Sequence, residues 1–367
     1  MLSYKKFTLY FLSLIIAFLI FNITVWNFAT KQILSKNDTY VTGDLARIGY
    51  ITSLLHKRKN INTLPKKHLQ VKTYKFQKLD MITLGDSFSN GKAGGLNRFY
   101  QDFIATYLNF NVLNIHSYKT ENDINTIITL LNSGFLKKTG VKYILYESTQ
   151  RKVIDRLTQN INFSKQDNIK NIIQYYGFVK TDNIKIKNKP ILSSPKQSFI
   201  NNGNFKYILY SFLYHFSDHA FISKTYIAYT TEKLFSIKPY NKFLFYKKDL
   251  TSIDKNTEKN IKLVNTTLNK LAKLLKKENI TLIFMPVVTK YDLYSNFIIN
   301  NNYKMDPFFN IFRKLKKEYI FIDTKKILLK ALNHKEKDIF YCDDTHWSFK
   351  SSDLIAKYLK NLLLPEL

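Results

Sequence analysis

A serine in the first third of the chain stands where a nucleophile is expected. Ser87 follows Gly85 and Asp86, directly after the apolar run at residues 79–84. That run has the length and composition of a buried parallel strand, and open α/β sheets bind ligands beyond the carboxyl ends of their strands. Gly85 lets the chain turn tightly here. We expect a helix to follow and to direct its amino-terminal N–H groups toward whatever Ser87 holds. The N–H of Ser87 itself would donate to an oxyanion.

A histidine near the carboxyl end supplies the partner that such a serine needs. Asp343 and Asp344 precede His346 by three and two residues. A serine hydroxyl is a poor nucleophile until an imidazole takes its proton, and the imidazole needs a carboxylate that fixes its tautomer and stabilises its cation. In a simpler interpretation, Ser348 caps the last helix and the acidic pair is solvated. The two interpretations are compatible, because the cap leaves His346 free.

The elements that must position these residues alternate between strand and helix. Short apolar runs predict strands at residues 79–84, 112–115, 142–146, 281–285 and 319–322. Helical spacing of apolar residues occurs at 96–108, 121–136 and 256–276, and again from Ser348. Strands that alternate with helices predict a parallel sheet covered by helices on its faces.

Residues 152–250 interrupt this alternation. They contain several prolines, an Asn-rich stretch and an aromatic run at 205–216. We interpret them as an insertion or lid beside the sheet. His215 and His219 lie four residues apart in a segment that we expect to be helical, a spacing that could bind a metal. Because the acidic residue of a zinc-protease motif does not accompany them and aromatic residues lie nearby, we interpret both as packing or interface residues.

The amino terminus has the features of a membrane anchor. Residues 7–28 carry no charge and follow Lys5 and Lys6, and Trp26 lies near the outer end of the run. Twenty-two residues are long enough to span a bilayer, and the alternative, a cleaved signal peptide, usually has a shorter apolar region. We expect residues 1–30 to be an anchor, 31–75 a juxtamembrane connector and 76–367 the main domain. That domain would lie outside the cytoplasm, on the periplasmic side of the inner membrane.

Composition argues against a nucleic-acid-binding protein despite a net charge of +30. Of the 57 basic residues only six are Arg, and the Lys residues are spread along the whole chain rather than clustered. Proteins that bind nucleic acids usually concentrate basic residues on one face. A single cysteine, Cys342, allows no internal disulfide and no metal site built from several thiolates. We expect neither a metal nor an organic cofactor.

Together the two motifs resemble those of the SGNH (GDSL-type) hydrolase superfamily. Gly85-Asp86-Ser87 is similar to its first block, and the spacing from Asp343 to His346 is similar to that of its last. The run Asp344-Thr345-His346-Trp347 resembles more closely the SGNH-like domains of bacterial polysaccharide O-acetyltransferases of the alginate type. One departure is the order, because in the alginate branch this run precedes the serine.

The resemblance implies a flavodoxin-like three-layer α/β/α fold with a central five-stranded parallel sheet. It also implies a catalytic triad of Ser87, His346 and an aspartate. The general superfamily spacing selects Asp343 as that aspartate, whereas the acetyltransferase run selects Asp344 and continues through Trp347. Both remain open, and we favour Asp344.

The oxyanion site departs from the superfamily pattern. The usual Gly after the second strand and Asn after the third are absent from residues 114–118 and 147–151. The acetyltransferase branch often has a Glu and an Arg at the latter place, which resemble Glu147 and Arg151. Equally, these two residues could simply pair on the first turn of a helix. We include Gly85, Asp86, Glu147, Arg151 and Trp347 as candidate oxyanion or substrate-binding residues.

The resemblance implies an extracytoplasmic O-acyltransferase, most simply an acetyltransferase, that modifies a polysaccharide. Ser87 would accept the acyl group from a membrane-embedded donor protein and pass it to a sugar hydroxyl. Two alternatives are an esterase or deacetylase with the same triad, and a non-catalytic glycan-binding assembly subunit. The absent Gly and Asn favour the last, and the retained Ser, His and Asp argue against it.

Overall fold

A computed structural model describes residues 2–34, 43–56, 58, 64–159, 161–178 and 198–364 of the chain. Its centre is a sheet in which every neighbouring pair of strands is parallel. The six strands are β1 (Leu69–Gln70), β2 (Met81–Leu84), β3 (Val112–Asn114), β4 (Tyr143–Thr149), β7 (Thr281–Val287) and β8 (Ile320–Phe321). All four side chains of β2 are buried, as expected for a strand with helices on both faces.

The sheet confirms the predicted fold class and corrects the number of strands. The strand order is β1-β3-β2-β4-β7-β8. The last five of these are the five predicted strands, and their order along the sheet is the 2-1-3-4-5 order of flavodoxin-like folds. The sixth, β1, comes from the segment that we expected to be only a connector. In this topology ligands bind where the chain reverses direction across the sheet, between β2 and β4.

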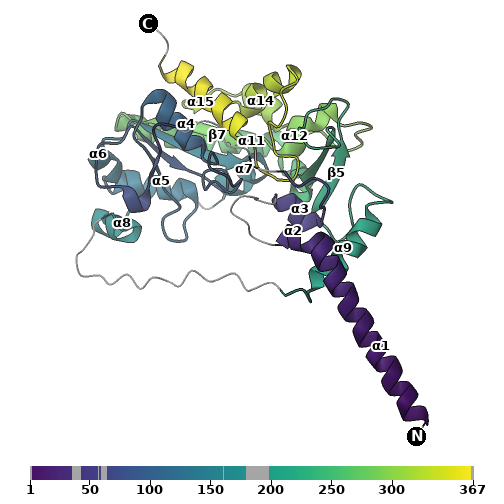
Figure 1. The fold of residues 1–367 in the computed structure, drawn as a ribbon. Helices are drawn as coiled ribbons and strands as arrows, with labels where there is room; N and C mark the ends of the chain where they lie inside the picture. The colour runs from purple at the N-terminus through teal and green to yellow at the C-terminus, as the bar shows by residue number, and fades with distance from the viewer. Residues whose placement is uncertain are drawn as a thin grey trace.

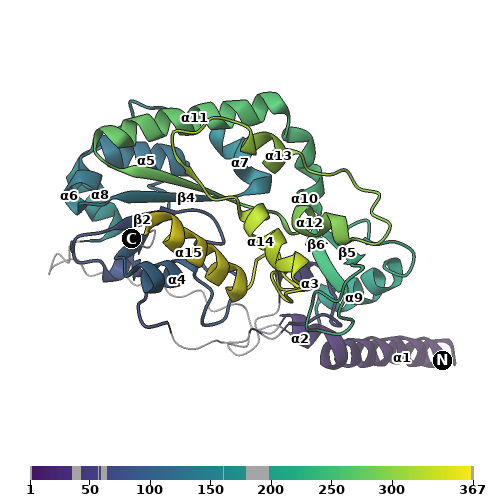
Figure 2. The ribbon, with the colours of Figure 1, turned by 90° about the horizontal axis from the view of Figure 1, so that it is seen from above.

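Helices cover both faces of the sheet (Figure 2). One layer contains α4 (Tyr100–Leu108), α14 (Thr324–Asn333) and α15 (Phe349–Leu363). The other contains α5 (Asp123–Asn132), α7 (Gln150–Leu157), α11 (Glu258–Lys277) and α13 (Phe308–Arg313). Ser348 caps α15 by accepting a hydrogen bond from the N–H of Lys350, as predicted.

The helix predicted after Ser87 is present but begins later than expected. The helix expected at 96–108 begins only at Tyr100, and residues 87–98 form a series of turns in which Gly91, Gly94 and Gly95 have positive φ. No helix therefore begins at Ser87 to direct its N–H groups toward a ligand. The turns themselves hold the serine loop, because the N–H of Lys92 donates to the carbonyl of Ser87.

The insertion contributes short elements. These are α8 (Ile169–Tyr176), α9 (Asn202–Leu213), β5 (Thr225–Tyr229), β6 (Lys242–Tyr246) and α10 (Lys247–Thr251). Of these, α8 lies beside α5 and α6 (Phe135–Thr139), and the others lie on the opposite side of the molecule, near α3 (Asp44–Gly49) (Figures 1 and 2). β5 and β6 form a separate antiparallel pair. Of the insertion, residues 160 and 179–197 lie outside the described part of the chain, and these include Pro190 and Pro195.

The predicted histidine pair is not on a helix. α9 ends at Leu213, before His215, and His219 forms an isolated bridge with Tyr226, on whose ring it stacks. The Nδ1 atom of His215 bonds the carbonyl of Ser211. The two histidines therefore do not share a helix face, and their contacts are those of packing and turn residues.

The amino-terminal helix projects away from the domain (Figure 1). α1 (Leu2–Val25) continues through a π turn (Trp26–Thr30) into α2 (Lys31–Leu34). Within the described residues, Tyr4–Leu34 is the one helical stretch that is long and apolar enough to cross a membrane. Further along the chain, α3 (Asp44–Gly49) packs on the β5–β6 pair.

Candidate functional site

His346 and Asp344 form a buried, hydrogen-bonded pair. Nδ1 of His346 lies 2.6 Å from Oδ1 of Asp344, and the backbone N–H of His346 donates to the same oxygen at 2.9 Å. The other ring nitrogen, Nε2, is buried and has no partner in the described part of the chain. An aspartate that holds Nδ1 leaves Nε2 to exchange a proton with a substrate or nucleophile, as in a serine triad.

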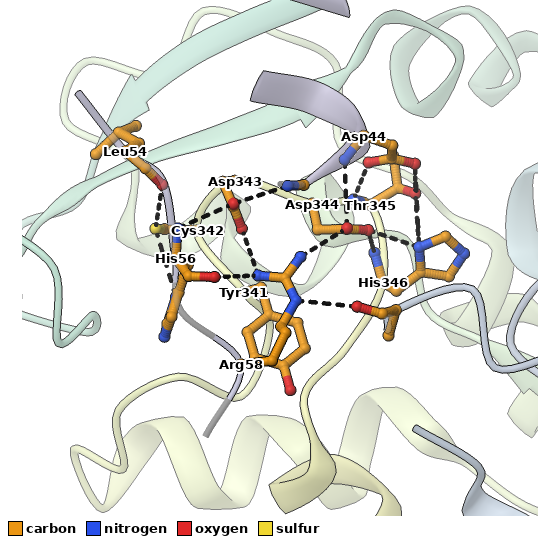
Figure 3. Close-up of polar contacts among 12 residues, drawn as sticks. Asp44, Leu54, His56, Arg58, Tyr341, Cys342, Asp343, Asp344, Thr345 and His346 are labelled. Atoms are coloured by element: carbon orange, nitrogen blue, oxygen red, sulfur yellow. Dashed lines mark hydrogen bonds and ion pairs between the residues drawn. The ribbon is translucent and has the colours of Figure 1, made fainter. Parts of the chain in front are cut away.

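Asp343 has a different role. Its Oδ1 accepts from Nη1 of Arg58 at 2.9 Å, and its Oδ2 accepts from the backbone N–H groups of Gly43 and His56. Arg58 also donates to Oδ2 of Asp344 at 2.8 Å, so its guanidinium bridges the two carboxylates (Figure 3). Of the two aspartates left open by the sequence, the geometry places Asp344 on His346 and Asp343 on the loop that supports it.

A third carboxylate, which the sequence did not indicate, lies beside His346. Asp44 accepts hydrogen bonds from the N–H and hydroxyl of Thr345 at 2.7 and 2.6 Å, and its Oδ2 lies 4.0 Å from Nδ1 of His346 (Figure 3). Burial and the neighbouring Asp344 charge raise the pKa of Asp44 to about 6. Asp44 is therefore ionised above that pH and adds negative charge next to the imidazole.

The surroundings raise the pKa of His346. Burial alone would lower it, but the bonded Asp344 carboxylate raises it more, and Asp44 adds to the increase. The same pairing holds the pKa of Asp344 well below its usual value despite its burial. An anionic aspartate beside an imidazole of raised basicity is the arrangement expected of a general base.

A buried lysine, Lys290, stabilises the loop that carries these residues. Nζ of Lys290 donates to the backbone carbonyls of Tyr341, Cys342 and Asp344 at 2.5, 3.0 and 3.0 Å. Burial lowers its pKa to about 8. All three of its protons are thus used in fixing the loop just before His346.

Ser87 lies near this pair but does not bond to it. The ring of Phe88, the next residue, lies 4.8 Å from the rings of both His346 and Trp347. Among the described residues, neither the hydroxyl nor the N–H of the half-buried Ser87 has a hydrogen-bond partner. The structure therefore brings the segments around Ser87 and His346 together. The hydroxyl and the N–H of Ser87 both remain without a hydrogen bond to the described residues. Catalytic hydrogen bonds are often long or absent without substrate.

Asp86 and Glu147 fix the serine loop to the end of β4. Oε2 of Glu147 accepts from the N–H groups of Asp86 and Ser89 and from the Ser89 hydroxyl. Asp86 in turn accepts from Thr149, and from Arg156 at 3.0 Å. A Cβ on Gly85 would lie 2.3 Å from Glu147, so only glycine fits there.

The pKa values of these two carboxylates are shifted in opposite directions. Burial and the nearby Asp86 charge raise the pKa of Glu147 well above its usual value, which favours its neutral form. Burial acts against ionisation of Asp86 as well, but Arg156 and Thr149 lower its pKa. Both side chains are therefore committed to holding the loop rather than exposed to a ligand.

The two remaining candidate residues lie near the site in supporting positions. β4 extends to Thr149, which places Glu147 inside the strand, and Arg151 pairs with the buried Asp249 at 3.1 Å. Glu147 and Arg151 thus do not pair with each other. The positive charge of Arg151 nevertheless has a small electrostatic effect on His346, whose pKa it lowers. Trp347 is buried against Phe88 and Tyr100.

Two groups of side chains have the types and spacing of metal ligands. One is His56, Cys342 and Asp343, and the other is Asp44, Asp344 and His346. In the first, Asp343 already binds the Arg58 cation and two N–H groups, and burial raises the pKa of the Cys342 thiol. In the second, Arg58 and Thr345 engage the carboxylates. The carboxylate oxygens of both groups therefore accept hydrogen bonds from neighbouring residues.

Comparison with known proteins adds one finding. Residues 240–366 match the family described as SGNH hydrolase-like domain, acetyltransferase AlgX. The predicted resemblance is confirmed. The matched part includes Lys290, Asp344 and His346 and excludes Ser87. No curated protein and no solved structure matches the chain.

Sequence reasoning missed Asp44, Arg58 and the role of Lys290. The first two lie in the segment that we expected to be a connector, about 300 positions before the residues that they contact. One signal was available, because an Arg is rare in this Lys-rich chain. Guanidinium groups are preferred where two carboxylates must be bridged.

Proposed function

We propose that this protein is a membrane-anchored extracytoplasmic O-acyltransferase, most simply an acetyltransferase, that modifies a cell-surface polysaccharide through an acyl-Ser87 intermediate. The matched domain supports an acyltransferase or esterase activity. The observation that carries the proposal is the buried His346–Asp344 pair: the imidazole ring packs against Phe88, the residue after Ser87, and its Nε2 has no hydrogen-bond partner among the described residues.

The reaction would follow from these contacts in two steps. Oγ of Ser87 attacks the acyl carbonyl while Nε2 of His346 takes its proton, and the N–H of Ser87 donates to the developing oxyanion. The donor alcohol leaves with the proton from Nε2. A sugar hydroxyl then attacks the acyl-serine, passing its proton to Nε2, and Ser87 is released as the hydroxyl.

The anchor supports the choice of substrate and donor. Tyr4–Leu34 would hold the domain at the outer face of the inner membrane, where a membrane-embedded acyl-donor protein and a nascent polysaccharide can both reach it. The extracytoplasmic position is consistent with the acetyltransferase family that residues 240–366 match.

The test is acyl transfer from a chromogenic acetyl ester, with and without added oligosaccharide, by the wild type and Ser87→Ala. We expect ester turnover and acyl-serine formation to be lost in Ser87→Ala and retained in Ser164→Ala, which alters an exposed serine elsewhere on the surface. Acetylated sugar that forms faster than free acetate supports a transferase. Acetate release that no sugar diverts identifies an esterase, and no Ser87-dependent turnover overturns the proposal in favour of a binding subunit.

A further inference from the structure

The helix α9 exposes an unbroken apolar stripe. Its spacing of three, one, three and four residues places all the side chains on one face of the helix and its following turn. The stripe consists of Phe205, Ile208, Leu209, Phe212 and Phe216. Their exposed fractions range from 43% to 76%. Large contiguous apolar surfaces of this kind mark contacts with a membrane or a partner rather than with water.

The opposite side of α9 is fixed to the protein by polar contacts. Asn204 is buried, donates to Oδ1 of Asn22 at 2.8 Å and accepts from the hydroxyl of Thr30 at 2.6 Å. Tyr210 meets the ring of Tyr50 edge-on at 5.6 Å. The helix is therefore turned with its polar side inward and its apolar side outward, the reverse of a helix that packs on a water-soluble core.

The stripe continues the apolar surface of the amino-terminal helix. α9 lies beside the outer end of α1 (Figure 1). The ring of Phe205 lies 4.8 Å from that of Phe21 and 6.3 Å from that of Phe18. Residue 21 lies about 10 Å along the helix from residue 28, the end of the apolar run. If α1 spans the bilayer, Phe205 lies at the depth of its outer apolar turns.

Basic side chains gather where the inner side of α9 meets the domain. Arg47, Lys206 and Lys224 line one pocket together with Tyr210 and Ile222. Clustered cations beside an apolar helix face fit the anionic headgroups of a lipid leaflet. This arrangement favours a lipid surface over a second protein as the partner.

We propose that α9 lies in the outer headgroup region of the bilayer, with its stripe in the acyl-chain boundary and the three basic residues at the level of the lipid phosphates. The inference rests on the membrane anchoring included in the proposed function, and it adds a second contact. With α1 alone the domain would be tethered, whereas α1 and α9 together fix its orientation. The contact of α9 with the bilayer would also orient the site. α9 is followed by β5, where the hydroxyl of Thr225 donates to the carbonyl of Leu45, the residue next to Asp44.

The test uses the full-length chain in lipid nanodiscs, labelled at single cysteines with an environment-sensitive fluorophore. Phe212→Cys and Phe216→Cys report on the stripe, Phe11→Cys on the anchor, and Leu263→Cys on the exposed face of α11. Cys342 is buried and its raised pKa keeps the thiol protonated, so it contributes little labelling. We expect brominated lipids to quench positions 11, 212 and 216 at least twofold and to leave position 263 unchanged.

Each other outcome overturns the proposal in a distinguishable way. Quenching at position 11 without quenching at 212 and 216 means that α1 is inserted and α9 is not. No quenching at any position would show that α1 does not insert into the bilayer, which contradicts the proposed membrane anchoring. The ester assay tests the catalytic part of the proposed function independently. Disulfide cross-links between two copies at position 212, without lipid quenching, would assign the stripe to a second copy of the chain.

Discussion

At the scale of single residues, the arrangement around His346 separates two adjacent aspartates by role. Asp344 bonds the imidazole, and Asp343 bonds Arg58 and two backbone N–H groups. We predict that Asp344→Asn lowers kcat/KM for an acetyl ester by about 10⁴-fold, because an amide at this place stabilises the wrong tautomer of the histidine. Steady-state kinetics with the folded variant provide the measurement.

The matched variant is Asp343→Asn. It breaks a buried ion pair, for which a cost of about 3–5 kcal/mol in the free energy of unfolding is expected. The protein that remains folded should keep the pH dependence of the wild type. If the two variants lose activity equally at full folding, the assignment of Asp344 to the imidazole is wrong.

A second prediction concerns Asp44 and the pH profile. His346 must be neutral to act as a base, so kcat/KM should rise with pH through its pKa. The Asp44 charge raises that pKa. Asp44→Asn removes the charge, and the acid limb of kcat/KM should therefore move to lower pH. The control is Asp254→Asn, an exposed carboxylate paired with Lys304, which should leave the limb in place. An unchanged limb in Asp44→Asn would exclude an electrostatic role for Asp44.

At the scale of elements, the loop before His346 depends on a lysine from the start of α12 (Lys290–Tyr294). Lys290→Met would remove one donor from each of three buried carbonyls, of which those of Tyr341 and Cys342 keep a backbone N–H partner. For the loss of three hydrogen bonds to a buried cation we predict a decrease on the order of 3 kcal/mol in the free energy of unfolding. Urea denaturation measures it. Lys304→Met, at an exposed lysine, should change stability by less than about 0.5 kcal/mol. Equal effects of both substitutions would show that the buried contacts do not stabilise the loop.

The elements that could be predicted from the sequence are those with long apolar runs. β4, β7 and β8 were found because four consecutive apolar residues mark each of them, and β2 because Thr83 alone interrupts such a run. β1 was missed because no apolar run marks it: Leu69 is followed by the polar Gln70, whereas the equally short β8 lies within the four apolar residues 319–322. The helix near 96–108 was placed too early because apolar spacing alone ignored the glycines at 94 and 95, whose positive φ continues the turn.

The candidate site was predictable only where its residues are close in sequence. The His346 segment and the Gly85-Asp86-Ser87 turn carry local patterns, so they could be recognised. Asp44 and Arg58 carry none, because their contacts come entirely from tertiary folding. The alternative in which Glu147 and Arg151 pair is wrong because β4 extends further than its apolar core, a boundary that local patterns define poorly.

At the scale of the whole molecule, the segment between the amino-terminal helix and the sheet is part of the site rather than a simple link. Gly43, Asp44, His56 and Arg58 all bond to residues 343–345. A Cβ on Gly43 would lie 2.0 Å from the carbonyl oxygen of Asp343, so this segment approaches as closely as a backbone can. Removing α1 and α2 and removing residues 43–58 should therefore have different consequences.

The last prediction compares two truncated chains, one beginning at residue 43 and the other at residue 64. The first lacks α1 and α2 but keeps Asp44 and Arg58, and we expect ester turnover within about threefold of the full-length chain, since no contact to His346 is lost. The second leaves Asp343 and Asp344 as buried charges without their cation, a loss of about 3–5 kcal/mol. Its turnover should fall at least 100-fold, and circular dichroism should show whether the rest of the sheet persists. Equal activity of the two chains would mean that residues 43–58 only connect the anchor to the domain, whereas loss in both would place the requirement in α1 itself.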